Sequence, residues 1–540
     1  MSPAARRAAA GLAGAAAMIA AVTVLSRVLG FGRWMAQAAA VGSGAIGDSY
    51  NSANLLPNVL FEVAVGGALA GALVPVLAGP IARVDRREVD ATVSGAVGWT
   101  LLILVPLAGL LAGLSGPLAS LLAGDDAAQR STIQFFVTVF AVQVPMYGFA
   151  VLLYAVLQAH KRFFWPAFAP VLASLVTIAT YLVYAALADG ERNDPAGLDP
   201  AALDVLAWGT TLGVAAMCLP MLIPVRRLGV RIRPSLHFPP GVAGRLRALA
   251  LAGVGSVAAQ QLATVVVILV SQRWGATGTL PVFLYSQQVY LLPYAVLVVP
   301  LATSTFPRLA TRAAARDRAG FAATSSVVTR AVVASSAVGV AAVIAAAYAV
   351  GTMFEVLTKD PRVADQMGAA LTWMVPGLIG FGLLFHASRS LYALERGRSA
   401  VIANVSGWLV MAVAVVVFVG ADVPDDRAVV SIAAASTVGM TVGGIVAAIA
   451  LGRAAGHDAL AGLARTVAVL AVATAAAAVI GRWMADTVQD MGGDGFWTAA
   501  GAAAGAGILA VVIVGGALVV LDRTTLTGLL HAERGPAPKV

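Results

Sequence analysis

Cysteine, histidine and lysine are scarce in this 540-residue sequence. The single cysteine, Cys218, excludes an intramolecular disulfide and a cluster of cysteine ligands. The five histidines never form a pair with ligand-like spacing, which argues against a structural zinc site. None of the three lysines follows a glycine, so the sequence has no phosphate-binding loop of the Gly-x-x-x-x-Gly-Lys type and gives no support for ATP hydrolysis. We therefore expect no metal site and no cofactor.

Charged residues are also scarce. They make up 11% of the chain, hydrophobic residues make up 60%, and the mean hydropathy is +0.88. A soluble domain has about 25% charged residues and about 45–50% apolar ones. This composition excludes a soluble enzyme and predicts a polytopic membrane protein.

The apolar residues fall into fourteen stretches long enough to cross a membrane. A helix needs about 20 apolar residues to span a bilayer core of about 30 Å. The predicted spans are residues 12–41, 59–78, 94–123, 133–158, 167–188, 205–225, 248–272, 283–306, 327–350, 370–392, 400–420, 428–452, 466–484 and 496–521. We predict an all-α polytopic membrane protein with 14 transmembrane helices.

Basic residues alternate between successive loops, as the positive-inside rule predicts. With the N-terminus in the cytoplasm, 25 basic residues fall on the inner side and seven on the outer side, and the outer side carries 17 of the 26 acids. Because the number of spans is even, both termini are expected in the cytoplasm. The net charge of +9 then reflects membrane orientation, and we expect no nucleic-acid partner.

The partition counts Arg389 with the inner side and Arg482 with the outer side, although both lie near the ends of predicted spans. Once Arg330, at a helix end, is set aside, three charged residues remain for the membrane interior: Arg27, Arg33 and Glu62. A buried arginine is costly in a membrane, which makes a functional role the default interpretation. Guanidinium groups bind phosphate oxygens in pairs, so two arginines with one acid suit an anionic ligand, above all a diphosphate. In the alternative, Arg27 or Arg33 pairs with Glu62 or with backbone carbonyls and only pins the first two spans together.

Arg27 and Arg33 are separated by six residues, which corresponds to a rise of about 9 Å along a helix. Gly30 and Gly32 lie between them. A bend at these glycines would bring the two guanidinium groups toward one site.

Two short matches at nearly the same offset predict an internal repeat. Leu56-Pro57 matches Leu292-Pro293, 236 residues later, and Leu153-Tyr154-Ala155 matches Leu391-Tyr392-Ala393, 238 residues later. An offset of six spans preserves orientation, as in transporters whose halves are related by an axis along the membrane normal. We predict a six-helix bundle at 1–225, a cytoplasmic linker at 226–247, a second six-helix bundle at 248–452, and two further helices with a cytoplasmic tail at 453–540.

The motifs around the first two spans resemble those of a known family. They are Ser26-Arg27-Val28-Leu29-Gly30-Phe31 with Arg33, then Asp48, Leu56-Pro57-Asn58, and Gly66-Gly67-Ala68 through Val74-Pro75. With Lys161-Arg162-Phe163 and the layout of fourteen spans, they resemble the MurJ (MviN) lipid II flippases of the MOP (multidrug/oligosaccharidyl-lipid/polysaccharide) exporter superfamily. The resemblance implies the MOP-type transporter fold.

The resemblance also implies a function. Members of this family move the undecaprenyl-diphosphate-linked peptidoglycan precursor from the inner to the outer leaflet of the bacterial cytoplasmic membrane by alternating access. This would make the chain a transporter and not an enzyme. Arg27 and Arg33 would then be the cavity arginines that hold the diphosphate, and Asp48 the acid at the outer end of the cavity.

The remaining candidate residues for substrate binding are Asn58, Glu62 and Arg273. Asn58 belongs to the matching motif, and for Glu62 a functional and a structural role both stay open. Asp48 lies in a predicted short loop, where such a residue is usually a solvated turn residue. Some family members have an Asp-Arg pair where this sequence has Gln287-Gln288, and we expect Arg273 to substitute for it.

The expected partners are lipid II, membrane lipids, a coupling ion (Na⁺ or H⁺) and proteins of cell-wall synthesis. An ion would need neutral ligands such as Gln260, Gln261, Asn404 or Thr437, which are more typical of helix packing. The membrane potential is the simpler energy source, at about 2.3 kcal/mol per charge per 100 mV.

Two other functions were weighed against the flippase. The first is a MOP-superfamily exporter of another polyprenyl-linked oligosaccharide or of an organic cation, although a cation exporter would favour acids over arginines in its cavity. The second is a membrane enzyme acting on polyprenyl phosphates, for which the inner loops offer only sparse candidates such as Asp85, Glu88 and Asp90.

Overall fold

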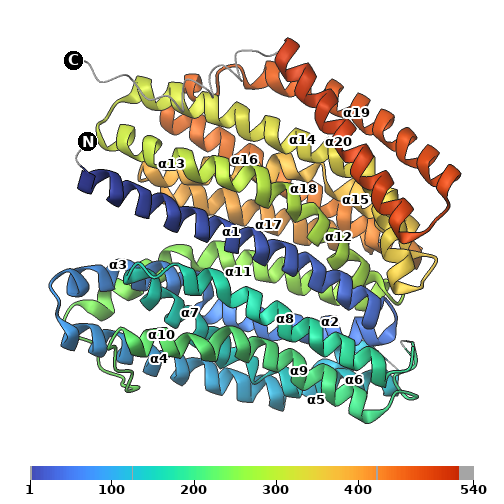
Figure 1. Ribbon diagram of the computed structural model, residues 1–540, viewed down its shortest axis with the longest axis horizontal. Helices are drawn as coiled ribbons and strands as arrows, with labels where there is room; N and C mark the ends of the chain where they lie inside the picture. Colours follow the sequence, from blue (N-terminus) through green and yellow to red (C-terminus); the bar gives the residue numbers. More distant parts are fainter. Residues whose placement is uncertain (1–2, 125, 192, 421–423, 522–540) are drawn as a thin grey trace. The chain divides into compact units, whose positions relative to one another are not determined.

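Helices are the only secondary structure in the residues that the structure describes, which are 3–124, 126–191, 193–420 and 424–521 of a computed structural model. The chain divides into two units, Met1–Gln261 and Leu262–Val540, called unit 1 and unit 2 (Figure 1). The predicted all-α class is confirmed.

Eleven helices of the described residues are long and apolar enough to cross a membrane, or twelve if the bent pair Val363–Met374 and Gly377–Ala393 is one span. These twelve coincide with the third to the fourteenth predicted spans. The first two predicted spans are not among the twelve. The first falls on α1 (Pro3–Ala40), and the second falls on the series of α2 (Ala45–Phe61), η1 (Glu62–Gly66) and α3 (Gly67–Ala82). The count of fourteen therefore stays a prediction.

Unit 1 begins with the long helix α1 and ends within α11. Its elements are α1 (Pro3–Ala40), α2 (Ala45–Phe61), η1 (Glu62–Gly66), α3 (Gly67–Ala82), α4 (Arg86–Gly113), α5 (Ser115–Ala123), α6 (Ala127–Phe140), α7 (Gln143–Ala159), α8 (Phe164–Leu187), α9 (Pro200–Cys218), η2 (Leu219–Met221), α10 (Leu222–Arg227) and α11 (Val242–Trp274).

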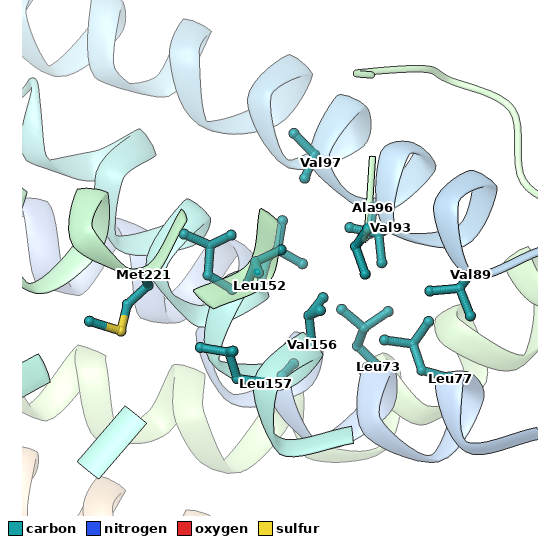
Figure 2. Close-up of a cluster of buried hydrophobic side chains, with 14 of the residues drawn as sticks. Leu73, Leu77, Val89, Val93, Ala96, Val97, Leu152, Val156, Leu157 and Met221 are labelled. Atoms are coloured by element: carbon teal, nitrogen blue, oxygen red, sulfur yellow. The ribbon is translucent and has the colours of Figure 1, made fainter. Parts of the chain in front are cut away.

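A cluster of buried aliphatic side chains holds α3, α4 and α7 together in unit 1 (Figure 2). Each helix contributes residues four positions apart, which lie on one face of a helix. These pairs are Leu73 and Leu77, Val93 and Val97, and Leu152 and Val156. The cluster fixes the positions of the helices that border the cavity described below.

Helix α2 begins earlier than the hydropathy predicts. The second span was expected to start at residue 59, but α2 starts at Ala45 and contains Pro57. The residues before Pro57 include Asp48, Ser49, Asn51 and Ser52, all buried. Because these polar side chains are covered by protein and not by lipid, this part of α2 escapes a search for apolar stretches.

A π-helix interrupts a proline-containing helix in each unit. In unit 1, α2 passes through η1 into α3, and in unit 2, α12 (Thr279–Pro293) passes through η3 (Tyr294–Val298) into α13 (Val299–Ala314). A proline removes a backbone donor, which favours such local changes of hydrogen bonding. The shared pattern is what an internal repeat predicts, and the two six-helix bundles stay a proposal.

Unit 2 is packed through glycines on α18. Its other elements are α14 (Arg318–Thr358), α15 (Val363–Met374), α16 (Gly377–Ala393), α17 (Gly397–Val419), η4 (Asp425–Arg427), α18 (Ala428–Ala455), η5 (His457–Leu460), α19 (Leu463–Gly492) and α20 (Phe496–Leu521). A Cβ on Gly444 would lie 2.8 Å from Gly380 Cα, and one on Gly443 would lie 3.1 Å from Gly407 Cα. Small residues thus let α16 and α17 approach α18 closely, as in other membrane bundles.

Candidate functional site

The two arginines of the first predicted span lie on one continuous helix. Helix α1 runs from Pro3 to Ala40 through Gly30 and Gly32 without interruption (Figure 1), so the two glycines do not break the helix. Six residues of regular helix place Arg27 and Arg33 about 9 Å apart along the axis and about 120° apart around it. Arg27 is exposed within unit 1, and Arg33 is partly buried. The two side chains therefore leave α1 in different directions.

Neither arginine is neutralised by a carboxylate in the described part of the chain. The salt bridges found there join Arg83 to Glu88, Arg362 to Asp360, and Arg482 to Asp486. The Cζ atom of Arg33 lies 5.5 Å from the ring centroid of its neighbour Trp34. The alternative in which Glu62 pairs with an arginine to pin the first two spans is thus not what this structure shows.

Arg33 lies beside a buried network of polar side chains in unit 1. Gln37, one turn further along α1, donates from Nε2 to Asn51 Oδ1 of α2 at 2.9 Å. The Tyr181 hydroxyl of α8 donates to Gln37 Oε1 at 3.2 Å. The Tyr50 hydroxyl of α2 lies 2.9 Å from that of Tyr181. These bonds fix the half of α1 that carries Arg33 against α2 and α8.

The same network continues to α9 and α7. The Tyr50 hydroxyl lies 3.0 Å from Thr210 Oγ1 of α9. On α7, Gln143 Nε2 donates to Thr211 Oγ1 at 3.1 Å, and the Tyr147 hydroxyl donates to Gln143 Oε1 at 3.3 Å. Arg33 is within electrostatic range of both Tyr50 and Tyr147. A partly buried cation thus lies near the hydroxyl groups of this network.

Sequence analysis missed this network. The signals were the polar run from Asp48 to Asn54 and the isolated Gln37, one turn from Arg33. Polar residues in apolar helices usually find partners in a neighbouring helix, so the composition indicates that a network exists. It does not indicate which helices share it.

Asp48 is buried and helical, which corrects the expectation of a solvated turn. It lies in the first turn of α2 and is 4% exposed. Its backbone N–H donates to Gly44 O at 3.0 Å. A carboxylate at this position is favoured by the partial positive charge at the helix N-terminus. Asp48 is thus held at the same end of α2 as Asn51.

Asn58 and Glu62 lie further along the second predicted span. Asn58 is exposed within unit 1, and Glu62 is partly buried and is the first residue of η1. The hydrogen bond between Gln37 and Asn51 joins α1 to α2. From this bond, the rise of a regular helix places Arg27 about 15 Å away along α1 and Glu62 about 16 Å away along α2. No salt bridge joins Arg27 to Glu62 in the described residues.

Arg273 belongs to a different unit from the other five candidates. It lies in the last turn of α11, within Leu262–Val540, and its side chain is exposed. Its role as a substitute for the Asp-Arg pair stays a prediction.

A further arginine, Arg389 in α16, lies among aromatic rings in unit 2. The charge partition assigned it to the inner side of the membrane. Its Cζ lies 4.3 Å from the ring centroid of Phe385, and its Nη1 donates to Thr303 Oγ1 of α13 at 3.2 Å. Tyr294, the first residue of η3, packs on Phe385 with a centroid distance of 5.5 Å. A basic group thus lies beside the π-helix of unit 2 through a cation–π contact.

Two of the four suggested ion ligands serve helix packing. Asn404 Nδ2 donates to Ser388 Oγ and to Ala400 O, both at 2.9 Å. Thr437 Oγ1 donates to Met374 O at 2.8 Å. In the described residues, no three His, Cys, Asp or Glu side chains gather as they would around a metal ion. A coupling ion stays a prediction.

Comparisons with known proteins agree on one family. Residues 37–501 match the family model described as "Lipid II flippase MurJ". A protein of Rhizobium meliloti (strain 1021) named "Probable lipid II flippase MurJ" is 29% identical over 303 residues, which cover 54% of each chain. The chain thus spans about half the length of the curated relatives it matches. Arg27 and Arg33 precede the matched region of the family model.

Solved structures show a common fold over most of the chain. A structure described as "Lipid II flippase MurJ, inward closed conformation" has a TM-score of 0.72 at 16% identity and covers 94% of this chain and 99% of its own. An inward-facing multidrug resistance MATE family transporter of the MOP superfamily has a TM-score of 0.63 at 14% identity and covers 81% of this chain and 98% of its own. The predicted MOP-type fold therefore agrees with these neighbours.

Proposed function

Because the chain belongs to the MurJ family of lipid II flippases, we propose that it moves lipid II from the inner to the outer leaflet of the bacterial cytoplasmic membrane. Lipid II, the substrate in the name of this family, is the undecaprenyl-diphosphate-linked peptidoglycan precursor. The family consists of flippases, so the chain is a transporter and not an enzyme, in agreement with the sequence prediction.

The observation that carries this proposal is the pair of arginines on α1 without carboxylate partners in the described residues. A cation inside a membrane protein is costly unless it meets protein, water or a ligand of opposite charge. Arg27 and Arg33 project about 120° apart, so together they cover a wide part of the surface of α1. We propose that each binds a different part of the diphosphate or of a neighbouring anionic group of the substrate.

The remaining candidates are proposed to complete this site from α2 and η1. Asp48 lies at the start of α2, and Asn58 and Glu62 lie near the π-helix. π-Helices inside longer helices frequently occur at functional sites. We propose that η1 and η3 let their helices rearrange during alternating access.

The alternative of an organic-cation exporter is not favoured. Such a cargo requires carboxylates, whereas the first two predicted spans carry one acid, Glu62, with two arginines. An exporter of another polyprenyl-linked oligosaccharide would share the diphosphate chemistry. Only a transport assay with lipid II separates these two cargoes.

The first prediction concerns the two arginines. Arg27→Ala or Arg33→Ala is expected to abolish growth of a strain in which this chain is the only lipid II flippase. Binding of lipid II to the purified protein is expected to weaken at least tenfold, because a hydrogen bond to a charged group contributes about 1.5–3 kcal/mol. Growth after depletion and lipid II titration measure the two effects.

Arg87→Ala is the matched control, since Arg87 is an exposed arginine outside the candidate site. Arg33→Lys keeps the charge and removes the forked geometry, so an intermediate affinity is expected. Normal growth of the Arg27→Ala/Arg33→Ala double variant at normal protein abundance would contradict the proposal.

A further inference from the structure

The segment that joins α10 to α11 is docked on α4. We call residues 229–238 the strap. The backbone N–H of Ser235 donates to Ser94 O at 3.1 Å, and that of Arg233 donates to Ser94 Oγ at 3.0 Å. The backbone N–H of Arg231 donates to Asp90 Oδ1 at 2.9 Å. The predicted linker thus has a defined course along a helix.

Two glycines of α4 allow this close approach. A Cβ on Gly98 would overlap the backbone of Ser235, and a Cβ on Gly95 would lie 2.7 Å from Cδ1 of Phe238. The Trp99 indole N–H also donates to Leu236 O at 3.0 Å. The strap therefore lies directly against α4 over more than one turn.

The strap covers one side of a cavity of about 630 Å³ in unit 1. The opposite sides come from α4, α7 and α10. The cavity has an apolar floor, formed by Val97, Leu101, Phe149 and Leu222, and a basic rim, formed by Arg226, Arg231 and Arg233. Val97 also belongs to the aliphatic cluster of α3, α4 and α7 (Figure 2), so the floor continues into packed protein.

The charges of the rim are not neutralised by protein. In the described residues, the guanidinium groups of Arg226, Arg231 and Arg233 form no salt bridge. Two acids at the start of α4 accept backbone N–H groups: Asp90 accepts that of Arg231, and Asp85 accepts that of Glu88 at 3.0 Å. Three cations around one cavity therefore leave an excess of positive charge at its rim.

The surroundings of the cavity are those of the membrane interface. Beside the strap, α4 exposes Trp99, Leu102 and Ile103, with 42%, 49% and 41% of their surfaces accessible in the described structure. A tryptophan with a bonded N–H and an exposed ring is typical of the boundary between headgroups and acyl chains. The distribution of basic residues places this boundary on the inner side.

We propose that this cavity binds an anionic phospholipid of the inner leaflet. The phosphate pairs with the guanidinium groups of the rim, and an acyl chain covers the apolar floor. Basic pockets on the cytoplasmic side of membrane proteins bind anionic headgroups in this way. A free phosphate would satisfy the arginines but leave the floor uncovered. None of the proposed lipid II contacts lines the cavity, so this is a second lipid site with a different ligand.

The test compares two triple variants of the full chain, purified in a neutral detergent. Arg226→Gln/Arg231→Gln/Arg233→Gln removes the rim. Arg87→Gln/Arg245→Gln/Arg247→Gln removes three exposed arginines of unit 1 that do not line the cavity. Native mass spectrometry with added phosphatidylglycerol is expected to show at least tenfold weaker binding for the rim variant and unchanged binding for the control. Equal binding by both variants would overturn the proposal.

A third variant separates a lipid from a free anion. Leu101→Trp fills part of the floor without changing the charge, so it is expected to weaken binding of phosphatidylglycerol at least fivefold. Thermal stabilisation by inorganic phosphate, if any, is expected to be unchanged in this variant. If inorganic phosphate displaces phosphatidylglycerol at equal concentration, the site is one for a free anion and the proposal is wrong.

The last arm separates this site from the transport site. Lipid II is expected not to compete with phosphatidylglycerol for the cavity, and the rim variant is expected to keep lipid II affinity. Loss of lipid II binding in the rim variant would make the cavity part of the substrate path and would overturn the second-site proposal while leaving the flippase proposal intact.

Discussion

At the scale of single residues, the two arginines of α1 have different surroundings although the sequence presents them as a pair. Arg33 is partly buried and lies one turn from Gln37, whose amide is held by Asn51 and Tyr181. Arg27 is exposed within unit 1 and lies further from this network. We therefore expect Arg33 to be the better oriented of the two before substrate binds.

The hydrogen bonds of Tyr50 give a prediction about stability. Tyr50→Phe removes the hydroxyl that joins Tyr181 and Thr210. Both partners keep another bond, to Gln37 and to Leu206 O, so the expected loss is about 1 kcal/mol in the free energy of unfolding. Thermal unfolding in detergent measures this loss as a lower midpoint temperature.

Tyr392→Phe is the control for that measurement, because Tyr392 is 48% exposed and lies outside the network. An equal midpoint for the Tyr50 variant and the wild type would mean that the network does not stabilise unit 1.

At the scale of elements, the structure changes the interpretation of two segments. The stretch before Pro57 was expected to be a loop, but it forms the buried start of α2. The segment after α10 was expected to be a linker, and the structure adds that it is hydrogen-bonded to α4. In both segments, polar groups are satisfied by neighbouring helices that hydropathy alone does not reveal.

The contact between the strap and α4 can be tested at one glycine. Gly98→Ala places a methyl group against the Ser235 backbone, so the strap is expected to detach. Trypsin is expected to cleave after Arg231 at least fivefold faster than in the wild type, because a protease requires a locally unfolded segment. Gly109→Ala in the same helix is the control, since its Cβ would meet no atom within 4 Å. Equal cleavage in both variants would show that the strap does not depend on this contact.

At the scale of the whole molecule, the distribution of charge predicts which side of the membrane each loop faces. The native Cys218 is buried and should react little, so single introduced cysteines can report the side. Pro424→Cys is expected to react with an impermeant maleimide in intact cells, and Ala319→Cys only after the membrane is opened. Both positions are exposed. The reverse pattern would place the termini outside the cell.

The sequence by itself determined the class, the approximate positions of twelve spans and the family. Transmembrane helices must be about 20 apolar residues long, and charges inside them are rare. Both the spans and the charges within them can therefore be recognised in a single sequence. The same reasoning identified Arg27, Arg33 and Glu62 as the charges within the first two predicted spans.

Tertiary structure alone decided how these groups are surrounded. Burial of Asp48, the network around Gln37, the ring contact of Arg389 and the docking of the strap all depend on side chains from distant helices. Hydropathy measures the preference of a residue for lipid or water. A polar side chain in a membrane protein can instead be buried against another helix and form hydrogen bonds there. Only the tertiary structure shows which polar side chains are buried in this way.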